Sequence, residues 1–225
     1  MTDQAAPRDL IGYANTRPRV RWPGGAQIAI NFVLDHEEGA EACVLNGDAA
    51  SETALSDLYM PSPMRGERNL NMESAYEYDS RVGIWRLLRI IEERQVPFTV
   101  CAVGLALDRQ PRAAEALARL DCDFVSHGWR WIDYHGMEEA TERDHIERAS
   151  AAIARHTGRR PQGYYCGRPS YNTRRLVASA GFVYDCDAYN DELPYWVTVA
   201  GQPHLVIPHT LDNNCPPSAP IGQFE

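Results

Sequence analysis

The chain has 225 residues, of which 44% are hydrophobic and 24% charged, values typical of one folded domain. Its 31 acidic residues outnumber the 22 basic ones, and the formal charge of −9 argues against nucleic acid as a partner, because binding phosphates requires a basic surface. All 22 basic residues are arginines, so the sequence offers no lysine for a Schiff base or for a phosphate-binding P-loop.

Neither the termini nor the cysteines indicate export. No apolar run approaches the length of a membrane span, and the first residues lack the basic and apolar segments of a secretion signal. The six cysteines are scattered without a Cys-x-x-Cys pair, which argues against a zinc knuckle and a disulfide framework. We expect a cytoplasmic protein that does not contact membranes, with Cys101 as a core thiol and Cys166 as a less favoured candidate nucleophile.

The first predicted elements are a strand and a long loop. Residues 27–34 form a nearly continuous apolar run after a Pro-Gly-Gly turn signal, which predicts a strand buried on both faces. Residues 46–78 are polar and lack a sustained period. A stretch of this kind is typical of a functional loop, and we expect it to fold over the site or over a neighbouring subunit. The alternative is a solvent-exposed loop.

Helices and strands then alternate. Apolar spacing predicts a helix over 81–94, capped by Asp79 or Ser80. The further predicted elements are strand 97–103, helix 112–120, strand 123–125, helix 138–156, strand 163–165, helix 173–180 and strands 182–184 and 205–207. This alternation predicts a single α/β domain over residues 1–225 with a parallel sheet, open or closed as a barrel. Chemistry then gathers at the carboxyl ends of the strands.

Three polar clusters follow predicted strands. Glu37 and Glu38 precede Gly39, and a carboxylate at a strand end can act as a general base. His127 directly follows a buried strand and can be an acid, a base, a metal ligand or a structural residue. Arg168 offers a bidentate cation for a carbonyl, ureide or carboxylate. Alternatively, the two glutamates belong to an acidic loop exposed to water, and Arg168 only pairs with an acidic surface loop.

The order of these clusters resembles the polysaccharide deacetylase superfamily, whose fold is a distorted (β/α) barrel of the NodB type. The first motif of that family is Thr-Phe-Asp-Asp-Gly, and alignment on Gly39 places Glu37 at the catalytic base and Glu38 at a metal ligand. The second motif is His-Ser/Thr-x-x-His, with both histidines on the metal. His127 matches the first histidine, whereas Trp131 takes the place of the second and cannot bind zinc.

The missing ligand makes the chain similar to the branch of this superfamily that hydrolyses allantoin without a metal. The stretches that carry the likeness are 7–13, 66–69, 72–74, 126–128, 130–134, 172–176, 184–187, 193–196 and 204–208. The resemblance implies opening of the hydantoin ring of allantoin to give allantoate, in purine degradation. It also implies a small-molecule substrate, no cofactor and a homo-oligomer.

The resemblance also implies roles for individual side chains. Glu37 deprotonates water, Glu38 orients substrate or keeps His127 charged, and Arg168 or protonated His127 stabilises the oxyanion. The substrate contacts would come from Trp131 against the flat ring, together with Glu73, Tyr76, Asn172 and Trp196.

Two rival functions stay open. Family members continue beyond the segment that matches residues 210–213, so we expect a C-terminally truncated barrel without the late histidine of the family. The first rival is a zinc-dependent deacetylase of N-acetylated, chitin-type polysaccharide, in which Glu38, His127 and His135 hold the metal. The second is an inactive remnant that at most binds a ureide or a sugar.

Overall fold

Two compact units make up the chain in the computed structural model, Met1–Asn31 and Phe32–Glu225. The structure describes residues 8–16, 18–53 and 64–210. In the first unit the Asp9 carboxylate accepts hydrogen bonds from the amides of Ile11 and Gly12, and η1 (Pro23–Gly25) is a single 3-10 turn. The second unit contains the sheet. The expectation of a single domain stays a prediction.

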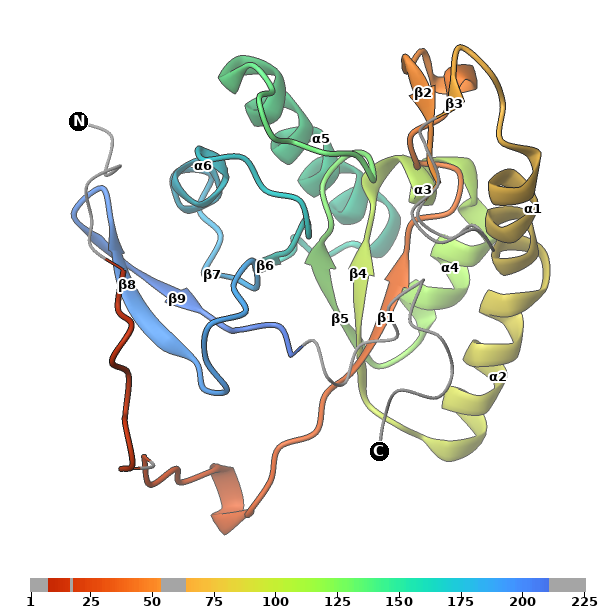
Figure 1. Ribbon diagram of the computed structural model, residues 1–225. Helices are drawn as coiled ribbons and strands as arrows, with labels where there is room; N and C mark the ends of the chain where they lie inside the picture. Colours follow the sequence, from red (N-terminus) through yellow and green to blue (C-terminus); the bar gives the residue numbers. More distant parts are fainter. Residues whose placement is uncertain (1–7, 17, 54–63, 211–225) are drawn as a thin grey trace. The chain divides into compact units, whose positions relative to one another are not determined.

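The sheet of the second unit has seven strands in the order β1-β4-β5-β6-β7-β9-β8 (Figure 1). These are β1 (Phe32–His36), β4 (Phe98–Ala102), β5 (Cys122–Ser126), β6 (Gly163–Tyr164), β7 (Tyr184–Asp185), β9 (Gln202–Val206) and β8 (Tyr195–Val199). All neighbours run parallel except β8 and β9, which form an antiparallel hairpin. The predicted α/β class with a mainly parallel sheet is confirmed.

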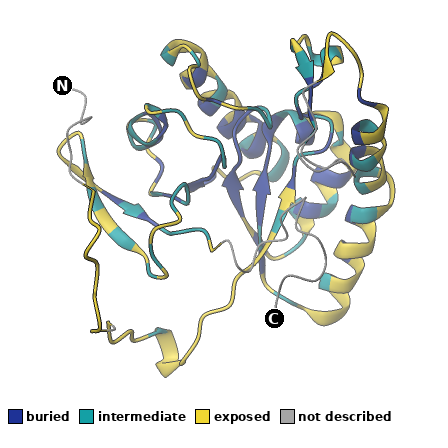
Figure 2. Ribbon diagram, in the orientation of Figure 1, coloured by how far each residue is buried: buried dark blue, intermediate teal, exposed yellow. Residues whose placement is uncertain are grey.

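Most predicted helices are present, with shifted ends. They are α2 (Ile84–Arg94), α4 (Pro111–Arg119), α5 (Glu139–Thr157) and α6 (Thr173–Ser179). The sequence did not predict α3 (Gly104–Arg109), the strand β8 or α1 (Leu70–Tyr78). The main core lies between α2, α4, α5 and the buried strands β4 and β5, with Leu88, Val100 and Phe124 among its residues (Figure 2).

The segment between β1 and α2 is more ordered than a long loop. Besides α1 it contains η2 (Val44–Asn46), the short hairpin of β2 (Ala50–Ser51) and β3 (Met64–Arg65), and the π-helical turn η3 (Asp79–Gly83), which leads into α2. The prediction of a structureless loop was therefore wrong for residues 70–78, and residues 54–63 lie outside the described part. Asn69, not Asp79 or Ser80, caps this helical region, because its side chain accepts from the amide of Met72.

The first strand is shorter and more exposed than predicted. It begins at Phe32, and Phe32 and Val33 are 57% and 44% exposed. The strand β1 lies at one end of the strand order and pairs with β4, with Phe32 in register with Phe98. The expectation of a strand buried on both faces was wrong for this reason.

Among the described residues no helix combines the length and apolarity needed to cross a bilayer.

Candidate functional site

The three predicted clusters follow β1, β5 and β6 at the carboxyl ends of these strands (Figure 1). Parallel pairing aligns these ends, with His36 opposite Ala102 and Ala102 opposite Ser126. The amide of His127 donates to the carbonyl of Ala102, which fixes the chain after β5 against β4. Loops that follow neighbouring parallel strands therefore bring Glu37, His127 and Arg168 to one edge of the sheet.

The two glutamates make different contacts. Glu37 Oε1 lies 3.0 Å from His127 Nε2. Glu38 Oε2 instead lies 2.8 Å from Nδ1 of the fully buried His36 and accepts a hydrogen bond from the Glu37 amide. Glu38 belongs to the turn that follows β1, which is closed by the hydrogen bond from the Ala40 amide to the Glu37 carbonyl. Glu37, and not Glu38, is therefore the carboxylate that holds His127.

His127 is buried, at 1% exposure, and both ring nitrogens have partners. Nδ1 lies 2.5 Å from the carbonyl oxygen of Tyr165, and a carbonyl can only accept, so Nδ1 carries a proton. One proton is then shared between Nε2 and the Glu37 carboxylate. Burial alone would lower the pKa of His127, but the hydrogen bond and charge of Glu37, with the charge of Asp35, raise it to about 9. His127 is therefore an imidazolium at neutral pH.

Trp131 and Arg168 form an aromatic and cationic wall beside this pair. The Trp131 ring lies 5.0 Å from the His127 ring, and the Arg168 guanidinium lies over Trp131 at 4.6 Å. Arg168 Nη1 also lies 3.0 Å from Oε2 of the buried Glu52, a residue of the polar segment. Arg168 therefore has an acidic loop partner and also lies over the ring next to His127, while its role toward a substrate stays a prediction.

A second aromatic layer was missed by sequence reasoning. The Tyr165 ring stacks on His127 at 5.0 Å, and His209 stacks on Tyr165 at 4.7 Å. Burial lowers the pKa of His209, so this imidazole is neutral at pH 7. Nothing local in the sequence marks these residues, because the stack depends on how β5, β6 and the chain after β9 align.

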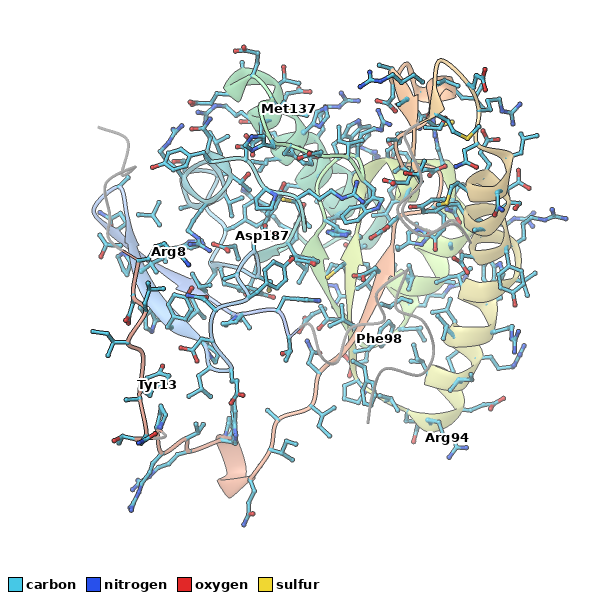
Figure 3. All side chains as sticks on the ribbon, in the orientation of Figure 1. Arg8, Tyr13, Arg94, Phe98, Met137 and Asp187 are labelled. Atoms are coloured by element: carbon cyan, nitrogen blue, oxygen red, sulfur yellow. The ribbon has the colours of Figure 1, made fainter. Side chains whose placement is uncertain are left out.

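A buried carboxylate shapes the loop that carries Arg168. Asp187, labelled in Figure 3, accepts hydrogen bonds from the amides of Cys166 and Gly167. Burial raises the pKa of Asp187, and these amides oppose the rise. Burial, and then the negative charge of Asp187, raise the pKa of the Cys166 thiol. A thiol that stays protonated is a poor nucleophile, so this environment gives no support to a nucleophilic role for Cys166.

The substrate-binding candidates fall into two groups. Tyr76 is buried, and the charges of Glu37, Glu52 and Glu41 add to burial in raising the pKa of its hydroxyl, which places it near the site. Glu73 lines the same cleft as Tyr76 and is held by Arg68.

The other two candidates lie apart from the Glu37–His127 pair in the described contacts. Asn172 precedes α6, where its side chain accepts from Arg175. Trp196 is 65% exposed on β8, at the opposite end of the strand order from β1.

The donor set does not fit a zinc ion. Trp131 occupies the position of the second histidine, and Glu38 is directed to His36 rather than to His127. Both nitrogens of His127 are engaged by Tyr165 and Glu37. Within residues 8–16, 18–53 and 64–210, no three His, Cys, Asp or Glu side chains form a group with metal-binding geometry, so Glu38, His127 and His135 do not gather there.

Comparison with known proteins identifies the family of this fold. Residues 75–184 match the family model described as polysaccharide deacetylase. A Schizosaccharomyces pombe protein named "Putative polysaccharide deacetylase" is 38% identical over 229 residues, which cover 92% of this chain and 71% of that protein. The crystal structure of PuuE allantoinase superposes with a TM-score of 0.86 at 50% identity, covering 93% of this chain and 70% of that one. A "probable Polysaccharide deacetylase" from Pseudomonas aeruginosa PAO1 gives 0.85 at 51% identity, with 93% and 71% covered.

Proposed function

This chain belongs to the polysaccharide deacetylase family, and we propose that it is a hydrolase of cyclic amides that opens the hydantoin ring of allantoin to give allantoate. The likeness to PuuE allantoinase, at 50% identity over 93% of the chain, supports this choice of substrate. The observation that carries the proposal is the Glu37–His127 pair, which is built for proton transfer at a place where the family motif would have a metal.

The proposed reaction uses one water molecule. Glu37 takes a proton from the water, and the resulting hydroxide oxygen bonds to the ring carbonyl carbon. The carbonyl oxygen then carries negative charge, which Arg168 or the protonated His127 stabilises. Collapse of this intermediate breaks the C–N bond of the ring, and the leaving nitrogen takes the proton from Glu37. Atoms and charges balance, and the carboxylate is regenerated.

The walls of the site suit a small flat ring better than a sugar chain. Trp131 provides an aromatic face, against which a planar hydantoin can stack while its carbonyl oxygens face Arg168. Glu38 lies close to His36 and accepts a hydrogen bond from the Glu37 amide, so we propose a supporting role for it, in orienting the turn that holds Glu37. A contact between Glu38 and substrate stays a prediction.

The test is allantoin consumption by the purified chain in excess EDTA. We expect turnover with EDTA present, loss of turnover in Glu37→Gln, and unchanged turnover in Glu115→Gln, a control on the exposed face of α4. Retained activity in Glu37→Gln would contradict its role as base. Turnover of an acetylated chito-oligosaccharide that depends on added zinc would support the deacetylase named among the relatives. Absence of both activities would favour the inactive remnant.

Location and assembly remain proposals. We place the protein in a reducing compartment such as the cytoplasm, because the five cysteines of the described residues are free thiols. A homo-oligomer is our expectation from the resemblance, and light scattering of the purified chain would test it.

A further inference from the structure

A cleft of about 220 Å³ lies among the chain after β1, the start of the α1 region and α3. Among its lining residues are Glu41, Cys43 and Asn46 from the chain after β1, Arg68 just before α1, Tyr76 on α1 and Arg109 on α3. No sequence motif drew attention to this place, since only Tyr76 and Glu73 of its lining were predicted to contact substrate.

Glu41 is a buried carboxylate with an unused hydrogen-bonding position. The residue is 7% exposed, and Oε2 has no hydrogen-bond partner among the described residues. Burial raises the pKa of Glu41, against the lowering effects of the Gly39 and Glu41 amides and of Arg109 and Arg130. A buried polar oxygen without a partner costs free energy, so a ligand that donates a hydrogen bond to it would be bound favourably.

The rest of the cleft is polar and nearly balanced in charge. The Arg68 guanidinium donates to Glu73, with Nε 3.0 Å from Oε1, so these two charges neutralise each other. Arg109 is directed to the Asn46 side chain at 2.8 Å and to the carbonyl of Gly39. Such a cleft favours an uncharged ligand that presents N–H donors and a carbonyl acceptor side by side, which is the chemistry of a ureide.

The cleft is within reach of the proposed catalytic pair. Gly39 lines it, and two residues of chain separate Gly39 from Glu37 by at most about 7 Å between Cα atoms. Tyr76 also lines it, and the charges of both Glu37 and Glu41 act on its hydroxyl. Gly39 and Tyr76 therefore link the cleft to the segment that carries Glu37.

We propose that this cleft binds the ureido group of the substrate, with the terminal amide nitrogen donating to Glu41 Oε2. The proposal rests on the proposed function and adds to it a residue that selects ureides. Hydantoin, which has the ring without the tail, would be hydrolysed without help from this cleft.

The test compares the two substrates in wild type and Glu41→Gln. The substitution keeps the shape and removes the charged acceptor. We expect kcat/KM for allantoin to fall by 10-fold or more, while kcat/KM for hydantoin stays within 2-fold of wild type. Glu115→Gln is the matched surface control and should change neither value. Equal losses on both substrates, or no loss on allantoin, would overturn the assignment.

A binding measurement separates this proposal from the proposed reaction. N-methylurea carries the ureido group alone, and its binding can be followed by NMR titration of the protein without any turnover. Binding to wild type that is weakened at least 10-fold in Glu41→Gln supports the cleft even if allantoin is not hydrolysed. Equal binding by both proteins, or none by wild type, shows that the cleft is not a ureide site whatever the enzyme's activity.

Discussion

The charge state of His127 depends on Glu37, and replacing Glu37 by Gln tests this dependence. A pKa of about 9 instead of the ordinary 6.5 corresponds to about 3.5 kcal/mol in favour of the imidazolium, at about 1.4 kcal/mol for each pKa unit. Burial opposes the charge and remains in the variant, whereas the ion pair at 3.0 Å is lost. We expect the pKa of His127 in Glu37→Gln to fall below 7.

The measurement is an NMR titration of the His127 ring from pH 5 to 10, in wild type and in two variants. Glu115→Gln is the control, because Glu115 lies on the exposed face of α4 and should leave the pKa of His127 unchanged. A wild-type pKa below 7, or the same pKa in Glu37→Gln and wild type, would refute the reasoning.

The same ion pair predicts the pH dependence of stability. A group whose pKa is raised on folding stabilises the fold fully below its unfolded pKa, and the contribution is lost as pH rises through the folded value. For His127 the window runs from about 6.5 to about 9. Urea unfolding should therefore show wild type losing up to about 3.5 kcal/mol relative to Glu37→Gln across this window. A constant difference between the two proteins would contradict the assignment.

Two further substitutions test the neighbourhood of the site. Arg168→Lys loses the planar group that stacks on Trp131, and we expect kcat/KM for allantoin to fall about 100-fold; an unchanged value would exclude Arg168 as the oxyanion donor. Gly163→Ala places a methyl group 2.2 Å from the Tyr184 ring and should cost about 1–3 kcal/mol of stability, measured by calorimetry. Gly83→Ala, which meets only a flexible side chain, should cost less; equal losses would contradict this account.

The sequence predicts an element well where one face is apolar and regular. The helix α2 and the strands β4 and β5 have this pattern, and all three lie in the main core. The helix α1 buries only Met72 and Tyr76, so its apolar period is too weak to detect, although Asn69 is a recognisable cap. The strand β8 is half exposed, and its hairpin turn depends on positive φ angles at Ala200 and Gly201.

The sequence predicts those site residues that directly follow a strand. Glu37, His127 and Arg168 follow strands, and the order of parallel strands brings them to one edge of the sheet. Their partners could not be predicted, because the Tyr165 carbonyl and the Glu52 carboxylate are far away in sequence and reach the site through tertiary contacts. The choice between Glu37 and Glu38 needed the geometry of the turn after β1, which directs one side chain to His127 and the other to His36.

The shared proton also distinguishes the two candidates for oxyanion stabilisation. Arg168 keeps its charge across the working pH range, whereas the Glu37–His127 pair loses its second ring proton near pH 9. If His127 donates to the oxyanion, kcat for allantoin must fall above pH 9, because the donor disappears with that proton. If Arg168 is the donor, kcat stays level or rises above pH 9, because Glu37 is then no longer paired with a cation and becomes a stronger base. We expect the level profile, since the guanidinium over Trp131 faces the ring that the substrate would stack on, while both nitrogens of His127 are already committed. A fall in kcat that follows the NMR titration of His127 would transfer the role to the histidine.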